Sequence, residues 1–244
     1  SSSGSAIAVA TGTACAAVGS DTGGSVRIPA AFNRLVGLKT SEGVVPCDGT
    51  VSLSFTLDTI GPIARTPRDA WYLYRAMAAL PPAPEPAPSG RLRFLAPTTV
   101  RQEELEPAVA EAFRESLERL RELGHEVEEA PVPLLAEVVE AMARYGGFAS
   151  HEAMALYGEL LEANFDEFDP RVRERILGAK ERPSSDYVKL LIGRKRWQEA
   201  FWGELAGIDA VLAPTVAVLP PRFEELEEDE EYFRLNGLVL RNTT

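Results

Sequence analysis

Residues 19–25, GSDTGGS, combine residue types that acyl and phosphoryl chemistry use: two serine hydroxyls beside a pair of glycines. Consecutive glycines allow a sharp backbone turn that brings several N–H groups toward one point. Such a turn can hold a phosphate group or the oxyanion that forms during acyl transfer. The same residues also fit a glycine turn with incidental serines, so the segment by itself leaves all three interpretations open.

The neighbouring residues narrow this choice. A Walker-type phosphate loop requires Gly-Lys followed by Ser or Thr, whereas Val26 and Arg27 follow Ser25. A β-lactamase-type Ser-x-x-Lys is absent because Ile28 lies three residues after Ser25, and the chain has no Gly-x-Ser-x-Gly. A second group of hydroxyls, SSSGS, occupies residues 1–5. Two Ser/Gly clusters therefore flank one short segment of small, apolar residues.

The composition limits the classes of partner and cofactor. The 244 residues carry a net charge of -12, which argues against a nucleic-acid or anionic-membrane surface. The two cysteines form no CxxC pair, and the two histidines are far apart in sequence, so we expect no metal site. We expect no cofactor either. There is no apolar run of about 18 residues and no signal peptide, which favours a reduced, cytoplasmic protein.

Apolar periodicity and glycine and proline positions predict the elements that must hold these clusters in place. The predicted helices are residues 4–11, 67–80, 103–123, most of 134–163 and most of 186–206. The predicted strands are residues 15–21, 91–97, 125–133 and 208–218, with Cys15 in the core. The stretch between Gly37 and Gly49, and onward to residue 66, is expected to be irregular.

Four segments resemble the motifs of the amidase signature family: SSSGSAIAVATG, GSDTGGSVRIPAAFNRLVGLKTSEG, LDTIGPIARTPRDA and DAVLAPT. The resemblance is dense over residues 1–80 and looser beyond. It implies an α/β fold with a mixed β-sheet core covered by helices on both faces. We assign residues 1–80 to the signature core, 81–92 to a Pro-rich connection, and 93–244 to the remainder of the same α/β domain.

The resemblance also implies catalytic residues, because the family uses a Ser–Ser–Lys triad. Ser25, the last serine of DTGGS, matches the nucleophile. Ser1, 24 residues earlier, matches the second serine, which in the family is held by a non-proline cis peptide. The N–H groups of Thr22, Gly23, Gly24 and Ser25 match the oxyanion hole.

The family lysine lies upstream of the first serine cluster, and the family continues past the last strand of this chain. We therefore expect the sequence to be truncated at both ends, with the catalytic lysine outside it. Lys39, in VGLKT, matches a family position that we interpret as structural.

Further positions have both a functional and a plain interpretation. Tyr157, in ASHEAMALY, and Arg175, in RVRERILG, are similar to family substrate contacts, although packing or surface roles are the alternative. Asp21 and Arg27 flank the glycine turn, where they either orient it through hydrogen bonds or form a simple ion pair.

We expect an amidohydrolase that converts a linear carboxamide to an acid and ammonia or an amine. The first alternative is the glutaminase component of a tRNA-dependent amidotransferase, that is, the A subunit of glutamyl-tRNA(Gln) amidotransferase. It is disfavoured by Ile28, where glutamine-using members often have Gln, and by the lack of an acid in residues 236–244. The second alternative is an amidase-like binding protein without activity. The expected partner is a small-molecule amide, with a homodimer left open.

Overall fold

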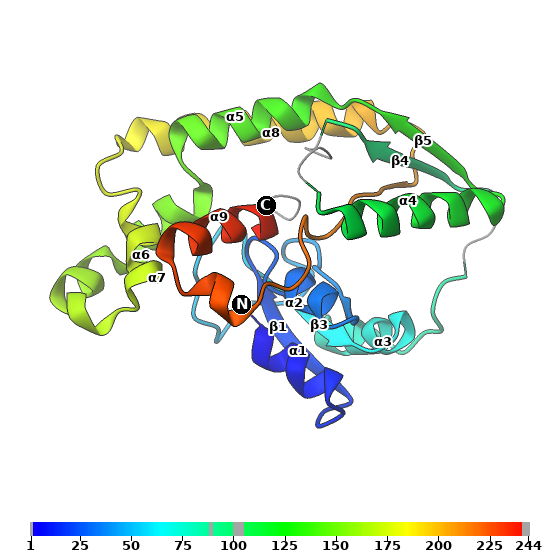
Figure 1. The fold of residues 1–244 in the computed structure, drawn as a ribbon, viewed down its shortest axis with the longest axis horizontal. Coiled ribbons are helices and arrows are strands. Elements are labelled where there is room, and N and C mark those ends of the chain that lie inside the picture. The colour runs from blue at the N-terminus through cyan, green and yellow to red at the C-terminus, as the bar shows by residue number, and fades with distance from the viewer. Residues whose placement is uncertain (1, 88–89, 100–104, 241–244) are drawn as a thin grey trace. The chain divides into compact units, whose positions relative to one another are not determined.

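The computed structural model describes residues 2–87, 90–99 and 105–240, which divide into two compact units (Figure 1). The first unit comprises residues 1–49, 59–130 and 208–244, and the second comprises residues 50–58 and 131–207. The Pro-rich stretch 81–92 lies within the first unit. The three-part division expected from the sequence stays a prediction.

The N-terminal part of the first unit is built on an antiparallel sheet of three strands. Its strands lie in the order β1 (Ala16–Asp21), β3 (Thr59–Ala64) and β2 (Val36–Gly37). Asp21, at the end of β1, lies opposite Thr59, at the start of β3. Gly61 permits the close approach of β3 to the chain after β2, because a Cβ atom there would lie 2.0 Å from the Leu38 carbonyl oxygen.

Three helices pack against this sheet, α1 (Ser3–Ala10), α2 (Arg27–Phe32) and α3 (Pro67–Met77). Small and β-branched side chains fill the core between these helices and the sheet, namely Ala6, Val9, Val26, Ala30 and Ile63. Helix α3 begins at a capped end, because Thr66 Oγ1 accepts a hydrogen bond of 3.1 Å from the Asp69 N–H. Small side chains let α1 lie close to β1, which brings the start of α1 near the turn after β1.

A second, parallel sheet belongs to the same unit. Its strands lie in the order β5 (Glu126–Ala130), β4 (Arg93–Pro97) and β6 (Ala210–Val211), and α4 (Pro107–Glu122) packs against β5. The strand predicted over residues 208–218 is wrong in extent. Only two residues pair as β6, and Pro214 lacks the N–H that a longer ladder needs. The 3-10 helix η3 (Phe223–Leu226) and helix α9 (Asp229–Leu240) follow.

The second unit is helical. It contains α5 (Pro133–Tyr145), α6 (Phe148–Ala163), η2 (Phe165–Glu167), α7 (Pro170–Leu177) and α8 (Ser184–Glu204). Helices α5 and α8 lie side by side, as Figure 1 shows. Phe148, Leu190 and Trp197 form one apolar cluster, and α6 and α7 share another. The loop of residues 50–58 belongs to this unit although it lies between β2 and β3 in sequence.

The mixed α/β class predicted from the sequence is confirmed, and within the described residues the strands form two separate sheets. The prediction for Cys15 is wrong. It precedes the first residue of β1 and its side chain is exposed. In the described ranges, no helix has the length and apolar character needed to cross a bilayer.

Candidate active site

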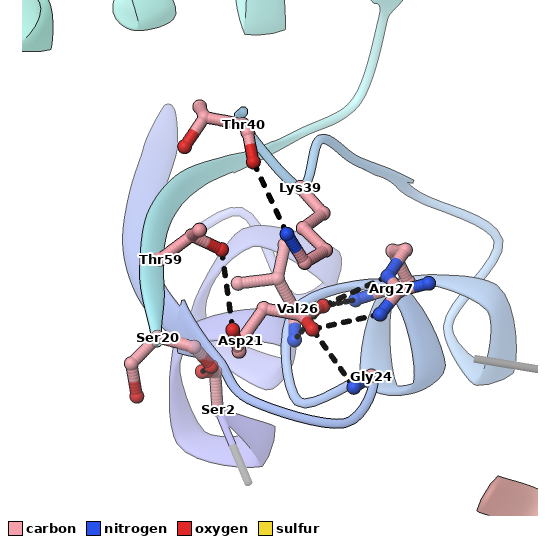
Figure 2. A network of polar contacts seen from close by, with 9 residues as sticks. All are labelled: Ser2, Ser20, Asp21, Gly24, Val26, Arg27, Lys39, Thr40 and Thr59. Carbon is pink, nitrogen blue, oxygen red and sulfur yellow. Dashed lines mark hydrogen bonds and ion pairs between the residues drawn. The ribbon is translucent and has the colours of Figure 1, made fainter. Parts of the chain in front are cut away.

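The side chain of Asp21 organises the turn that carries GGS (Figure 2). It is fully buried, and its Oδ1 accepts a hydrogen bond of 2.8 Å from the Gly24 N–H. Its Oδ2 accepts a bond of 3.2 Å from the Val26 N–H. The Arg27 guanidinium donates to both oxygens, from Nε at 3.0 Å and from Nη2 at 2.8 Å. One carboxylate therefore fixes the turn on both sides of Ser25.

The charge of this carboxylate is stabilised where it lies. Burial by itself raises the pKa of Asp21, because a desolvated carboxylate is disfavoured. The hydrogen bonds and positive charge of Arg27, together with the N–H groups of Gly24 and Val26, outweigh burial and hold this pKa below its ordinary value. Both interpretations of Asp21 and Arg27 are thus present. Asp21 orients the loop through hydrogen bonds to backbone N–H groups, and it forms a bidentate ion pair with Arg27.

The backbone of the turn requires glycine at one position. Gly24 has φ +117°, in the region that side chains with a Cβ rarely adopt. Its N–H is directed at Asp21, so this member of the expected oxyanion hole is hydrogen-bonded inside the turn. Thr22 and Gly23 lie between Asp21 and Gly24 and are half-buried.

The start of α1 is joined to the same turn. The Ser2 N–H donates to the Ser25 carbonyl oxygen at 3.0 Å, and Ser2 Oγ donates to the Ser20 carbonyl oxygen at 3.3 Å. Gly19 allows this approach, because a Cβ atom there would lie 2.4 Å from Ser2 Oγ. The structure therefore brings the two Ser-rich segments of the sequence into direct contact.

Of the two serines predicted to be catalytic, Ser25 lies in this contact. It is half-buried, and its Oγ has no hydrogen-bond partner among residues 2–87, 90–99 and 105–240. Ser1 lies outside the described residues, and with it the cis peptide predicted to hold it. Their predicted roles stay predictions.

The β3 strand holds the base of the turn. Thr59 is buried, and its Oγ1 donates to the Asp21 carbonyl oxygen at 3.1 Å (Figure 2). The turn therefore leaves β1 from a carbonyl group that is fixed by the neighbouring strand. Sequence reasoning missed Thr59, because its role depends on a strand pairing that the sequence did not predict.

Lys39 also lies near this region in the first unit. Its Nζ donates to the carbonyl oxygen of Thr40 at 3.2 Å, and Thr40 Oγ1 donates to the Ile60 carbonyl oxygen at 2.9 Å. The ammonium group thus contacts the main chain that runs beside β3, and the structural interpretation of Lys39 stays a prediction.

Tyr157 and Arg175, the two predicted substrate contacts, belong to the second unit. The Tyr157 hydroxyl donates to the carbonyl oxygen of Ser52. Arg175 is exposed in the last turn of α7. Contact of either residue with substrate stays a prediction.

A buried carboxylate in the second unit was also missed. Glu152 lies in α6 and is 1% exposed, with hydrogen bonds from Ser54, Thr56 and Tyr187. The sequence did contain a signal for it, because Glu152 is the one acidic residue among the small and apolar residues of ASHEAMALY. Within the described part of the chain, no group of three or more His, Cys, Asp and Glu side chains is placed to hold a metal ion.

Comparison with known proteins decides the family. The family model named Amidase matches residues 1–242. The chain belongs to the Amidase family. The resemblance of its serine and glycine motifs to that family is therefore confirmed.

Relatives within the Amidase family differ in their described activities. The 2-amino-5-chloromuconic acid deaminase of Comamonas testosteroni is 33% identical over 246 residues, which is 100% of this chain and 53% of that protein. The A subunit of the glutamyl-tRNA(Gln) amidotransferase of Roseiflexus castenholzii is 36% identical over 261 residues, covering 88% of this chain and 51% of that protein. The crystal structure of an amidase matches with a TM-score of 0.82 at 32% identity, covering 98% of this chain and 56% of the other. The chain spans about half the length of these relatives.

Proposed function

We propose that this chain carries the nucleophile of an amidohydrolase, which converts a linear carboxamide to a carboxylic acid and ammonia or an amine. The observation that supports this proposal most directly is the hydrogen bond from the Ser2 N–H to the Ser25 carbonyl oxygen. It joins the two serine clusters whose spacing matches the catalytic motif of the Amidase family. The buried Asp21 supports the proposal, because it fixes the turn on which Ser25 lies.

In the proposed reaction, Ser25 Oγ attacks the carboxamide carbon and its proton passes to the hydroxyl of Ser1. A serine hydroxyl is a weak nucleophile and needs a base. The family resemblance assigns that role to a neutral lysine upstream of Ser1, which takes the proton from the Ser1 hydroxyl. The new C–O bond turns the carbonyl oxygen into an oxyanion.

The oxyanion is stabilised by N–H groups of the turn, for which Thr22, Gly23 and Ser25 are the donors that the family resemblance implies. Each such donor is worth about 10²–10³ in rate when it is held in place beforehand. The Gly24 N–H, bonded to Asp21, shapes the turn instead. The C–N bond then breaks and the amine leaves with the relayed proton. Water attacks the Ser25 ester, which releases the acid and restores the hydroxyl.

Trapping with hydroxylamine tests the acyl-enzyme. In the whole protein acting on an aryl amide, hydroxylamine should compete with water for the Ser25 ester and yield a hydroxamic acid at the expense of the carboxylic acid. The share of hydroxamate should rise with hydroxylamine concentration. Release of the aryl amine with only carboxylic acid at every concentration, or no release at all, would contradict the proposal.

A glutaminase role is the second candidate, because the Roseiflexus castenholzii amidotransferase component is 36% identical to this chain. Ile28 and the absence of an acid in residues 236–244 favour the stand-alone amidase. Ammonia release from glutamine, compared with amine release from aryl amides, separates the two. Turnover of glutamine alone would favour the glutaminase.

A further inference from the structure

The carboxylate of Glu152 collects four hydrogen bonds. Oε2 accepts from Ser54 Oγ at 2.7 Å and from the Thr56 N–H at 3.0 Å. Oε1 accepts from Thr56 Oγ1 at 2.5 Å and from the Tyr187 hydroxyl at 2.9 Å. A carboxylate this deeply buried is tolerated only where such donors replace water. Three of the four donors come from residues 50–58, so Glu152 holds this loop on α6.

Most of the loop depends on these polar contacts, because three of its four apolar side chains face outward. In VSLSFT, residues 51–56, the serines and the threonine are buried or half-buried. The apolar side chains that alternate with them are exposed, namely Val51 at 89%, Leu53 at 44% and Phe55 at 59%. This reverses the ordinary pattern, in which apolar side chains are buried. Leu57 is the exception, because it packs against the cluster of Phe148, Leu190 and Trp197. Apolar burial therefore attaches the loop at Leu57, and polar contacts attach the rest of it.

Neighbouring groups complete the attachment. Arg194, in α8, donates from Nη2 to the Thr56 carbonyl oxygen at 3.0 Å, and the Tyr157 hydroxyl donates to the Ser52 carbonyl oxygen. Within the loop, Asp58 Oδ2 accepts from Ser52 Oγ at 2.8 Å. The same oxygen also accepts from the N–H groups of Leu53 and Ser54. Asp58 therefore shapes the loop from within, and Glu152 attaches it to α6.

The loop leads directly into the base of the nucleophile turn. Asp58 is followed by Thr59, whose hydroxyl holds the Asp21 carbonyl oxygen. We infer that Glu152 is a positioning residue: by fixing residues 50–58 it restrains the segment that runs covalently into Thr59, and so limits the motion of the residue that holds the Asp21 carbonyl oxygen in the turn carrying Ser25. Only the last step, the reactivity of Ser25, rests on the proposed function.

The test compares Glu152→Gln with Glu159→Gln, a matched change at an exposed position of α6. The glutamine NH2 group cannot accept the bonds that one carboxylate oxygen accepts, so the hydroxyls of Thr56 and Tyr187 must turn and accept instead, and the negative charge that the four donors stabilise is lost. In the whole protein, we expect amide hydrogen exchange in residues 50–58 to become at least about tenfold faster in Glu152→Gln, while β1 and α8 keep their protection. Thr56→Val, which removes one donor and keeps a branched side chain, should change exchange in the same direction by less.

The second readout is covalent labelling of Ser25 by a fluorophosphonate. We expect the maximal labelling rate to fall at least about fivefold in Glu152→Gln, with the half-saturating probe concentration within about twofold of its original value. Loop exchange equal to that of Glu159→Gln would overturn the inference, as would faster loop exchange with unchanged labelling. If Ser25 is not labelled in the unmodified protein, the proposed function and the positioning step both fail. The exchange experiment then still decides whether Glu152 fixes the loop.

Discussion

Asp21 is the residue on which the geometry of the nucleophile turn depends most. The glycines permit the turn, but its N–H groups are held by a buried carboxylate that also binds Arg27. The motif DTGGS indicated a turn with converging N–H groups. It did not indicate that the Gly24 N–H points back to Asp21, because the direction of a backbone N–H depends on tertiary contacts.

Replacing Asp21 by Asn should therefore loosen the turn. One amide oxygen cannot accept all the bonds that two charged oxygens accept, and the charge that pairs with Arg27 is lost. We expect the free energy of unfolding to fall by about 2–4 kcal/mol, measured by urea denaturation. Ser25 labelling should slow at least about tenfold. Asp48→Asn, at an exposed position, serves as the control, and equal losses in both variants would contradict this role.

The contribution of Asp21 should depend on pH. Its pKa is lower in the folded chain than the ordinary value of 3.8, so the folded protein binds this proton less tightly than the unfolded chain does. The stabilisation is fully present above the unfolded pKa and is lost as the pH falls through the folded pKa. The stability difference between the unmodified protein and Asp21→Asn should be constant above about pH 5 and shrink below 3.8. A difference unchanged at about pH 2.5 would contradict this.

At the scale of elements, the close contact of α1 with β1 places the two serine segments together. Gly19 makes that contact possible, since a Cβ atom there would lie 2.7 Å from Ser2 Cβ and 2.9 Å from a methyl group of Val26. We expect Gly19→Ala to lower the free energy of unfolding by about 1–3 kcal/mol and to slow Ser25 labelling.

Gly4→Ala is the matched control for that variant. Gly4 lies in α1, and an added Cβ atom would meet nothing within 4 Å. Alanine favours the helix over glycine by up to about 1 kcal/mol, so this variant should be at least as stable as the unmodified protein. Indistinguishable thermal denaturation of Gly4→Ala and Gly19→Ala would show that the approach of α1 to β1 does not require glycine.

The contact of α8 with Glu152 should appear in alkaline titration. The pKa of Tyr187 is raised to about 12. Burial is the largest cause, and the hydrogen bond to Glu152 and the negative charge of Glu152 add to it. Between the ordinary value of 10.0 and about 12, the folded chain keeps a proton that the unfolded chain releases. Stability should therefore fall as the pH rises through this window, and less so in Tyr187→Phe. Denaturation midpoints with the same pH dependence in both proteins would contradict this.

The sequence predicted elements best where local pattern decides them. Periodicity and Gly and Pro boundaries predicted helices α1, α3 and α4 and strands β1, β4 and β5. Strand β3 was missed, because Gly61 and Pro62 are typical of turns and only pairing with β1 makes this segment a strand. Strand β6 was predicted too long, since the apolar residues 216–218 are buried without being part of a strand.

At the scale of the whole molecule, the assignment of residues 50–58 to the helical unit could not be predicted. It depends on contacts such as the bond from Ser54 to Glu152, which are 98 residues apart in sequence. The Amidase family, by contrast, followed from the local motifs around Ser1 and Ser25, and the family model confirms it across residues 1–242. The catalytic roles rest on that resemblance and on the contact between the two serine segments.

The central claim is that Ser25 is the nucleophile, and the site of covalent labelling tests it most directly. The whole protein would be treated with a fluorophosphonate, digested and examined by peptide mass spectrometry. The account predicts an adduct on Ser25, no adduct in Ser25→Ala, and a loss of at least about 10³ in amide hydrolysis by that variant. An adduct on Ser20, or labelling retained in Ser25→Ala, would contradict it.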